Sequence, residues 1–125
     1  MESKSGVNMK RIVIILAGVV LFNGHSLAAN YWSGNQLFEQ YRKYVATQTN
    51  PTSDGLGAMG VYLGYIRASY EFIGMIDKQA CIPDAAEINQ FARIVGRYME
   101  QNPNKLHEPA FSIVMDSLRQ AFPCK

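Results

Sequence analysis

The sequence predicts an all-α protein: a compact four-helix domain with one disulfide, placed after a cleaved signal peptide. Three observations lead to this prediction. Apolar side chains recur at the three- and four-residue spacing of a helix face, and no stretch sustains the alternation of a strand. Two cysteines, the only ones in the chain, stand at the boundaries of predicted helices.

Residues 1–28 have the layout of a signal peptide. Lys10 and Arg11 precede the apolar run 12–22, and small residues up to Ala28 suit a cleavage site. The run 12–22 is shorter than the roughly 20 apolar residues that a membrane-spanning helix needs, so we expect no membrane anchor. We expect cleavage after Ala28. The expected domains are therefore a signal peptide at 1–28 and a helical domain at 29–125 that is exported to the periplasm.

Loss of the leader changes the charge of the chain. The leader holds three of the twelve basic side chains and one of the ten acidic ones, which leaves nine of each in the mature protein. A formally neutral domain lacks the positive field that nucleic acid or an anionic membrane requires, so we expect neither as a partner.

The first helix is expected after Ser33-Gly34-Asn35, polar residues that suit an N-cap, and should end near Thr47. Its apolar face consists of Leu37, Phe38, Tyr41, Tyr44 and Val45. The segment 49–55 is rich in turn-forming residues and is the one clear loop that the sequence predicts. Within it, Asp54 is a candidate cap for the next helix.

The second helix is expected at 56–76 and contains four glycines. Gly60, Gly64 and Ala68 follow one another at four-residue steps and form a stripe of small residues. Because an interior glycine costs a helix up to about 1 kcal/mol relative to alanine, the stripe indicates close approach of another backbone. We expect this to be another helix of the same bundle, and a second copy of the chain is the alternative.

The third helix is expected to begin with a capping box made by Asp84 and Glu87 and to end at Pro103. Its apolar face consists of Ile88, Phe91, Ala92, Val95, Tyr98 and Met99. The fourth helix is expected from near Pro109 to Pro123. Its apolar side consists of Ala110, Phe111, Val114, Met115, Leu118 and Phe122.

Cys81 and Cys124 are expected to form an intramolecular disulfide. They are isolated cysteines in a chain bound for an oxidising compartment, where such pairs are usually structural. A reactive or metal-bound pair is the alternative.

The mature chain offers little catalytic chemistry. His107 is its single histidine, and Ser112 lies among core positions of a predicted helix. We therefore expect no nucleophile–base pair. One histidine, two bridged cysteines and scattered carboxylates make no metal site, and the glycines lack the lysine of a phosphate-binding loop. We therefore expect no catalytic residue, no metal and no cofactor, and a binding protein rather than an enzyme.

Several short motifs follow one another in a defined order. They are Gly64-Tyr65-Ile66, Cys81-Ile82-Pro83, Asn102-Pro103 with Leu106-His107 and Pro109-Ala110, and finally Ala121-Phe122-Pro123-Cys124. With these motifs the chain resembles the Rap/Tai family of type VI secretion amidase immunity proteins, most closely those that counter the fourth group of amidase effectors.

The resemblance implies a periplasmic, all-helical and often dimeric protein that binds and blocks a secreted peptidoglycan amidase. Such amidases are papain-like cysteine hydrolases that cut the stem peptide between D-glutamate and diaminopimelate. Members of this family often carry a second disulfide between the first two helices. Tyr41 and Tyr62 stand at the corresponding positions here, where we expect two rings to pack instead.

We expect effector binding at two surfaces. The first is the loop 49–55, where Asn50, Ser53 and Asp54 can hydrogen-bond at small cost in side-chain entropy. The second is the polar face of the third helix, which carries Gln90, Arg93, Arg97 and Glu100. The alternative function is that of a small periplasmic acid-stress chaperone, since such proteins are also exported, helical and held by one disulfide.

Overall fold

The computed structural model describes residues 31–125, and the predicted signal peptide and its cleavage site lie outside this range. Between residues 31 and 125 the chain forms four α-helices, one short 3-10 helix and no strand. They are α2 (Gly34–Thr49), α3 (Ser53–Ile76), α4 (Ile88–Gln101), η1 (Pro103–Lys105) and α5 (Ala110–Ala121). A disulfide joins Cys81 to Cys124. The predicted all-α four-helix class and the disulfide are confirmed.

Helix α2 begins with a capping box at Ser33. The hydroxyl of Ser33 accepts from the backbone N–H of Gln36, and the side chain of Gln36 accepts from the backbone N–H of Ser33 at 2.9 Å. Two backbone donors that the helix leaves unpaired are thereby satisfied. The cap is therefore the first of the three polar residues expected before the helix, which begins at Gly34 and runs two residues beyond the expected end at Thr47.

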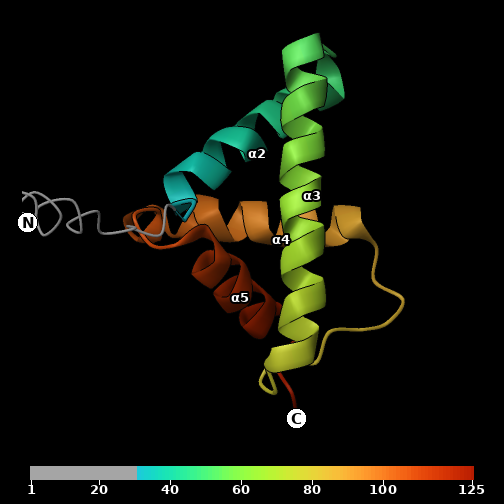
Figure 1. The fold of residues 1–125 in the computed structure, drawn as a ribbon, viewed down its shortest axis with the longest axis vertical. Helices are drawn as coiled ribbons and strands as arrows, with labels where there is room; N and C mark the ends of the chain where they lie inside the picture. The colour runs from blue at the N-terminus through green and yellow to red at the C-terminus, as the bar shows by residue number, and fades with distance from the viewer. Residues whose placement is uncertain (1–30) are drawn as a thin grey trace, which may run out of the picture. The chain divides into compact units, whose positions relative to one another are not determined.

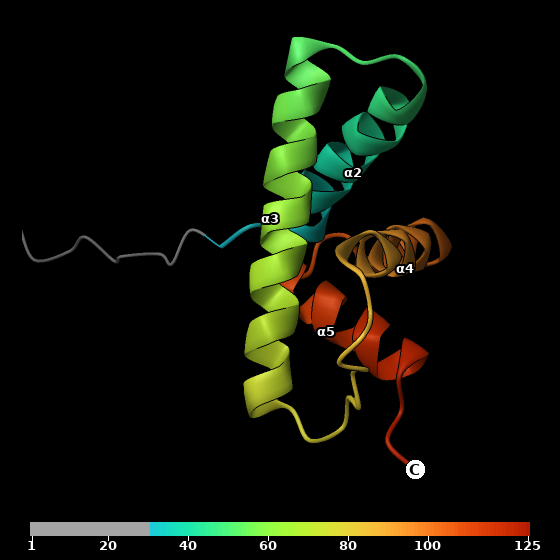
Figure 2. The same cartoon turned by 90° about the vertical axis from the view of Figure 1, so that its right-hand side faces the viewer.

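Helix α3 stands alone on one side of the domain, and the other three helices lie on the opposite side (Figure 2). α2 packs along one half of α3, α4 runs across it, and α5 lies next to α4 (Figure 1). All three helices contact α3. The side of α3 that faces away from them is therefore left uncovered by the rest of the described domain.

The centre of the core is the side chain of Tyr62. Its ring lies 5.5 Å from that of Tyr41 and 5.4 Å from that of Tyr44, and its hydroxyl donates to the carbonyl of Ala92 at 2.8 Å. Burial raises the pKa of Tyr62 above its usual value, so the phenol stays neutral and remains a donor. The packing of Tyr41 against Tyr62, expected in place of a second disulfide, is confirmed.

A close approach of α2 and α4 occurs at Gly96. A Cβ atom added at this position would overlap the ring of Tyr41. Since both residues are buried, neither can move aside without opening the core. The glycine that the fold requires therefore lies in α4.

The stripe of small residues on α3 has no partner within residues 31–125. A Cβ added at Gly60 or Gly64 would meet no heavy atom within 4 Å, and Ala68 is exposed. The expectation that another helix of the same bundle packs on the stripe is therefore wrong. Helix α3 instead buries the opposite face, where larger side chains remove more apolar surface from water: Ala58, Tyr62, Ile66, Ser69 and Ile73.

The start of α4 also differs from expectation. Its first residue is Ile88, and Glu87 precedes it as an N-cap that makes no side-chain hydrogen bond, so the expected capping box of Asp84 and Glu87 is wrong. The preceding residues form a turn in which the N–H of Ala86 donates to the carbonyl of Pro83 at 3.2 Å. Because this turn places Asp84 outside the helix, the α3–α4 connection runs from Asp77 to Glu87 and is the longest between the described helices.

Candidate functional site

The first expected binding surface lies at the α2–α3 connection. The predicted loop 49–55 is reduced to residues 50–52, because α2 continues to Thr49 and α3 begins at Ser53. Thr52, rather than Asp54, caps α3, and its hydroxyl accepts from the N–H of Gly55 at 3.0 Å. The expectation that 49–55 is the one substantial loop is therefore wrong.

The residues chosen at this connection remain accessible. Asn50, Ser53 and Asp54 are all exposed. The carboxylate of Asp54 lies in the first turn of α3, where negative charge is favoured, and is 3.4 Å from the ammonium of Lys43. With a side chain 79% exposed, Asp54 gains little from this ion pair and stays available to a partner. The connection is a tight, rigid corner.

The second expected surface is a groove between α4 and α5, with a volume of about 400 Å³. We call it the α4–α5 groove. Helix α4 contributes Gln90, Arg93, Ile94, Arg97, Tyr98 and Gln101 to its walls. Helix α5 contributes Ser117, Gln120 and Ala121. Three of the four residues chosen on this helix face, Gln90, Arg93 and Arg97, are thus brought together.

Glu100, the fourth residue chosen on this face, lies on the side of α4 that meets α2. Its carboxylate accepts from the hydroxyl of Tyr41 at 3.1 Å. Burial, and then this hydrogen bond, raise the pKa of Tyr41, which keeps the phenol in its donating form. Glu100 therefore orients a core tyrosine and does not line the groove.

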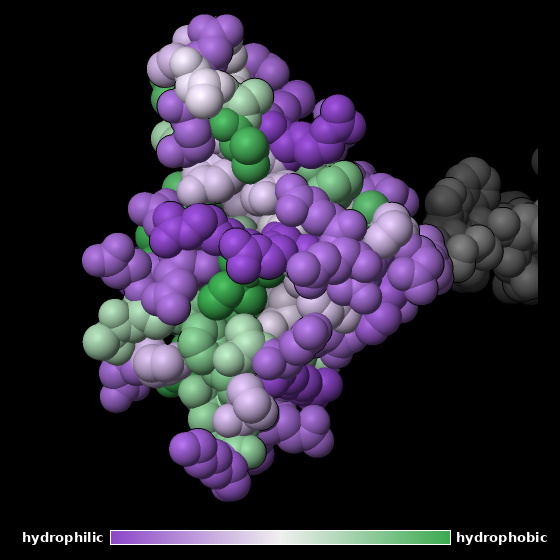
Figure 3. Space-filling view, turned by 180° about the vertical axis from the view of Figure 1, so that it is seen from behind, coloured by the Kyte–Doolittle hydropathy of each residue, from purple (hydrophilic) through white to green (hydrophobic). Residues whose placement is uncertain are grey.

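Gln101 and Gln120 are among the groove residues that were absent from the expected set. Gln101 follows Arg97 by four residues, so the helical period alone places it on the same face. Gln120 comes from α5, and only the packing of α5 against α4 brings it to the groove. Figure 3 views the face opposite α3 and has a hydrophilic band across its middle, at the height where α4 crosses the domain.

The two surfaces lie apart within one chain. The α2–α3 connection is at the far end of those two helices, whereas the groove lies where α4 and α5 meet (Figures 1 and 2). A flat partner surface would have difficulty reaching both on a single copy.

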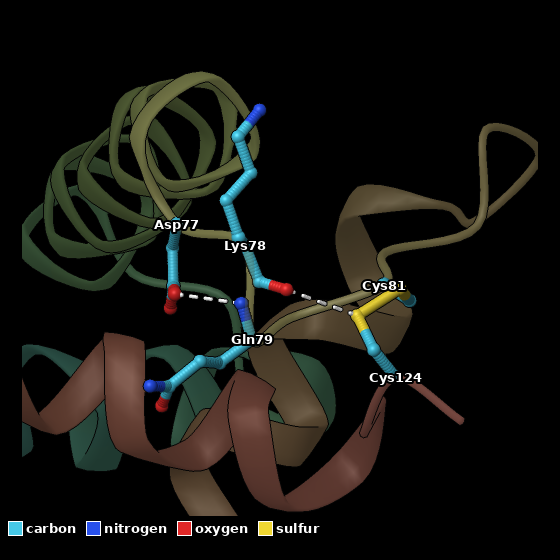
Figure 4. Close-up of a disulfide and its surroundings, with 5 residues drawn as sticks. All are labelled: Asp77, Lys78, Gln79, Cys81 and Cys124. Carbon is cyan, nitrogen blue, oxygen red and sulfur yellow. Dashed lines mark hydrogen bonds between the residues drawn. A yellow bond between two sulfur atoms is a disulfide. The ribbon is translucent and has the colours of Figure 1, made fainter.

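The long α3–α4 connection is held by the C-terminal end of the chain. Its disulfide between Cys81 and Cys124 is accompanied by a hydrogen bond from the N–H of Cys81 to the carbonyl of Phe122 at 2.9 Å. The sulfur of Cys124 also contacts the carbonyl oxygen of Lys78 at 3.4 Å (Figure 4). The sequence placed the disulfide here, but its role in anchoring this connection becomes visible only in the fold.

An ion pair fixes the beginning of the same connection. The carboxylate of Asp77 accepts from Nε of Arg119 at 2.7 Å and from the N–H of Gln79 at 2.9 Å. The hydrogen bond from Arg119 is the main reason that the pKa of Asp77 lies below its usual value. Helix α5 is thereby tied to the end of α3.

The uncovered side of α3 forms a further candidate surface. Five large apolar side chains on this helix are between 47% and 69% exposed: Leu56, Val61, Phe72, Met75 and Ile76. The ring of Phe72 still packs 5.8 Å from that of Phe111 on α5. The other four, together with Gly60, Gly64 and Ala68, make what we call the outer face of α3. Exposed apolar side chains grouped on one helix are typical of a surface that another protein covers.

Residues 31–125 show no metal site and no membrane-spanning helix. No group of three or more histidine, cysteine, aspartate or glutamate side chains is arranged to hold a metal ion in this part of the chain. None of its helices combines the length and hydropathy needed to cross a bilayer. His107, the histidine of the described domain, is exposed at the turn before α5.

Comparison with known proteins gives one family. A model of the family described as Rap1a immunity proteins matches residues 33–124, which include every described helix. No curated protein and no solved structure matches the chain.

Proposed function

Because the chain belongs to the Rap1a immunity protein family, we propose that it is a periplasmic immunity protein that binds and blocks a type VI secreted peptidoglycan amidase. The family match over residues 33–124 carries the proposal. The order of the short motifs favours a target in the fourth amidase group, whose members are papain-like cysteine hydrolases. An inhibitor of this kind needs a rigid surface that covers a cleft, and no chemistry of its own.

We propose that the amidase contacts the corner at Asn50, Ser53 and Asp54 and the α4 face that carries Gln90, Arg93 and Arg97. Both surfaces are exposed and both stand on helices fixed by the core, so little entropy is lost when a partner orders them. Glu100 has no direct contact with the amidase in this arrangement, since its carboxylate accepts the hydrogen bond from Tyr41.

We further propose that the protein is a homodimer joined through the outer face of α3. The support is the uncovered stripe at Gly60 and Gly64, which would let a second helix approach closely, and the exposed apolar side chains beside it. In such a dimer, one copy can offer its α2–α3 corner and the other its α4–α5 groove to the same amidase.

The dimer can be tested by sedimentation of the wild-type chain and of Gly64→Leu. Since nothing in the described chain lies within 4 Å of a Cβ at Gly64, the variant should keep the monomer fold and block only the approach of a second copy. A wild-type chain that stays monomeric at high concentration would contradict the dimer.

The proposed function is tested by co-expression with the amidase directed to the periplasm. The full-length chain should prevent lysis, and deletion of residues 1–28 should abolish protection because the cell wall lies outside the inner membrane. Lysis that proceeds unchanged in the presence of exported, folded chain would refute the immunity role. Full protection by a form shown to remain in the cytoplasm would refute the periplasmic site of action.

A further inference from the structure

The α4–α5 groove has an unbalanced charge. Two of the residues that line it, Arg93 and Arg97, are cationic, and none is acidic. They are four residues apart on α4, which places their side chains on one helix face about 6 Å apart at Cβ. Neither guanidinium forms an ion pair within residues 31–125.

The acidic groups near the groove are already engaged. Asp116 on α5 pairs with Lys105 at 3.5 Å and with Arg119 at 3.8 Å. Glu100 accepts from Tyr41 on the other side of α4. Neither carboxylate lies within ion-pair distance of Arg93 or Arg97, so both guanidinium groups stay unpaired within residues 31–125.

The walls of the groove suit a short peptide segment. Gln90, Gln101 and Gln120 supply amide groups that both donate and accept, as an extended backbone requires. Ile94 and Ala121 supply apolar contact. The volume of about 400 Å³ lies at the small end of the roughly 300–1,000 Å³ of known ligand sites, so it admits a few side chains and not a helix.

The floor of the groove is fixed by the core. Ser117 is 1% exposed and donates its hydroxyl to the carbonyl of Val114 at 2.7 Å. Tyr98 is 8% exposed, and its hydroxyl accepts from the ammonium of Lys105 at 3.0 Å. A preformed floor of this kind lets a ligand bind without reordering the protein.

We infer that the groove binds an acidic segment of the amidase, with an aspartate or glutamate carboxylate held between Arg93 and Arg97. The inference rests on the proposed function and names the chemistry of the partner at one site. Charge complementarity selects this occupant, because guanidinium groups pair bidentately with carboxylates and these two form no ion pair with any residue from 31 to 125. The adjoining backbone of the segment lies against the glutamine amides.

The test is calorimetric titration of the chain, expressed with its leader and purified from the periplasm, with the cognate amidase. The amidase to use is a secreted cysteine hydrolase from a reading frame next to this one, made inert by replacing its catalytic cysteine with alanine. Arg93→Glu and Arg97→Glu should each weaken binding by about thirtyfold or more. The wild-type affinity should also fall with salt more steeply than that of either variant.

Arg42→Glu is the matched control, since Arg42 is also an exposed arginine, lies on α2 and does not line the groove. It should change affinity less than threefold, an effect of roughly 0.6 kcal/mol. Circular dichroism should give the same helix content for all variants. Reversal of one acidic residue on the amidase to lysine should restore binding to Arg93→Glu or Arg97→Glu.

Two results would overturn the inference while leaving the proposed function intact. One is tight binding by the wild-type chain that neither groove variant weakens. The other is an equal loss in Arg42→Glu, which would indicate a general effect of net charge. Absence of any binding by the wild-type chain would instead refute the proposed function, and the groove inference with it.

Discussion

Replacing both Cys81 and Cys124 with serine is expected to lower the free energy of unfolding by about 4 kcal/mol. The disulfide joins residues separated by 43 positions, and for a loop of this length the chain-entropy model gives a loss of stability of that size. Both cysteines are exposed, so replacing them with serine leaves no cavity in the core. The change therefore acts mainly on the unfolded chain. For a domain under 100 residues, the melting temperature should fall by roughly 15–30 °C.

The assay is thermal and urea unfolding followed by circular dichroism. At low temperature the helix content should be unchanged, because every core residue except Ala80 and Leu106 lies on α2 to α5. Wild-type protein treated with a reductant serves as the control and should match the double-serine variant. A loss below about 1 kcal/mol, or a reduced wild type that stays as stable as the oxidised one, would refute the reasoning.

Three further outcomes are expected. Gly96→Ala should destabilise the fold by about 1–3 kcal/mol because its methyl group overlaps Tyr41, whereas Gly74→Ala, with open space at its Cβ, should be neutral or stabilising; equal unfolding midpoints would contradict this. Tyr62→Phe should cost about 1 kcal/mol in urea unfolding, since a buried hydrogen bond to a backbone carbonyl is lost; no change would be contrary to that assignment. Asp77 has a lowered pKa in the fold, so its stabilisation is complete above the unfolded pKa and is lost as the pH falls; Asp77→Asn should flatten the acid limb of stability, and an unaltered limb would disprove the role of this pair.

The helices could be predicted from the sequence because their signals are local. Periodic apolar residues and the cap at Ser33 define α2 without reference to any other element. The packing of Tyr41 against Tyr62 was also accessible, because the resemblance placed both residues between the first two helices. The disulfide could be predicted because the chain holds only two cysteines.

The errors concern features that depend on tertiary packing. Glycines on α3 were expected to pack against another helix, yet it is the opposite face of α3 that is buried in the core. The close approach between helices occurs at Gly96 instead. Asp84 and Glu87 have the spacing of a capping box, but the turn at Pro83 ends before α4 starts. Ile113, buried at 1% exposure, was missed because Phe111 and Met115 suggested a slightly rotated face of α5.

In the candidate site, too, the residues placed by the helical period could be predicted and those placed by tertiary packing could not. The helical period brings Gln90, Arg93 and Arg97 together, and this was predictable. The contribution of Gln120 was not, since it depends on how α5 meets α4. The engagement of Glu100 with Tyr41 likewise follows from the packing of α2 on α4 and has no signal in the spacing of α4 alone.

The central claim is that this chain blocks a peptidoglycan amidase, and its most direct test is inhibition of that enzyme in solution. Purified, exported chain is titrated into the active cognate amidase while cleavage of isolated peptidoglycan stem peptides is followed by mass spectrometry. Activity should fall in proportion to added chain and reach zero near a fixed ratio of inhibitor to enzyme, as expected for tight binding at the cleft. Undiminished cleavage in the presence of excess folded chain would contradict the account.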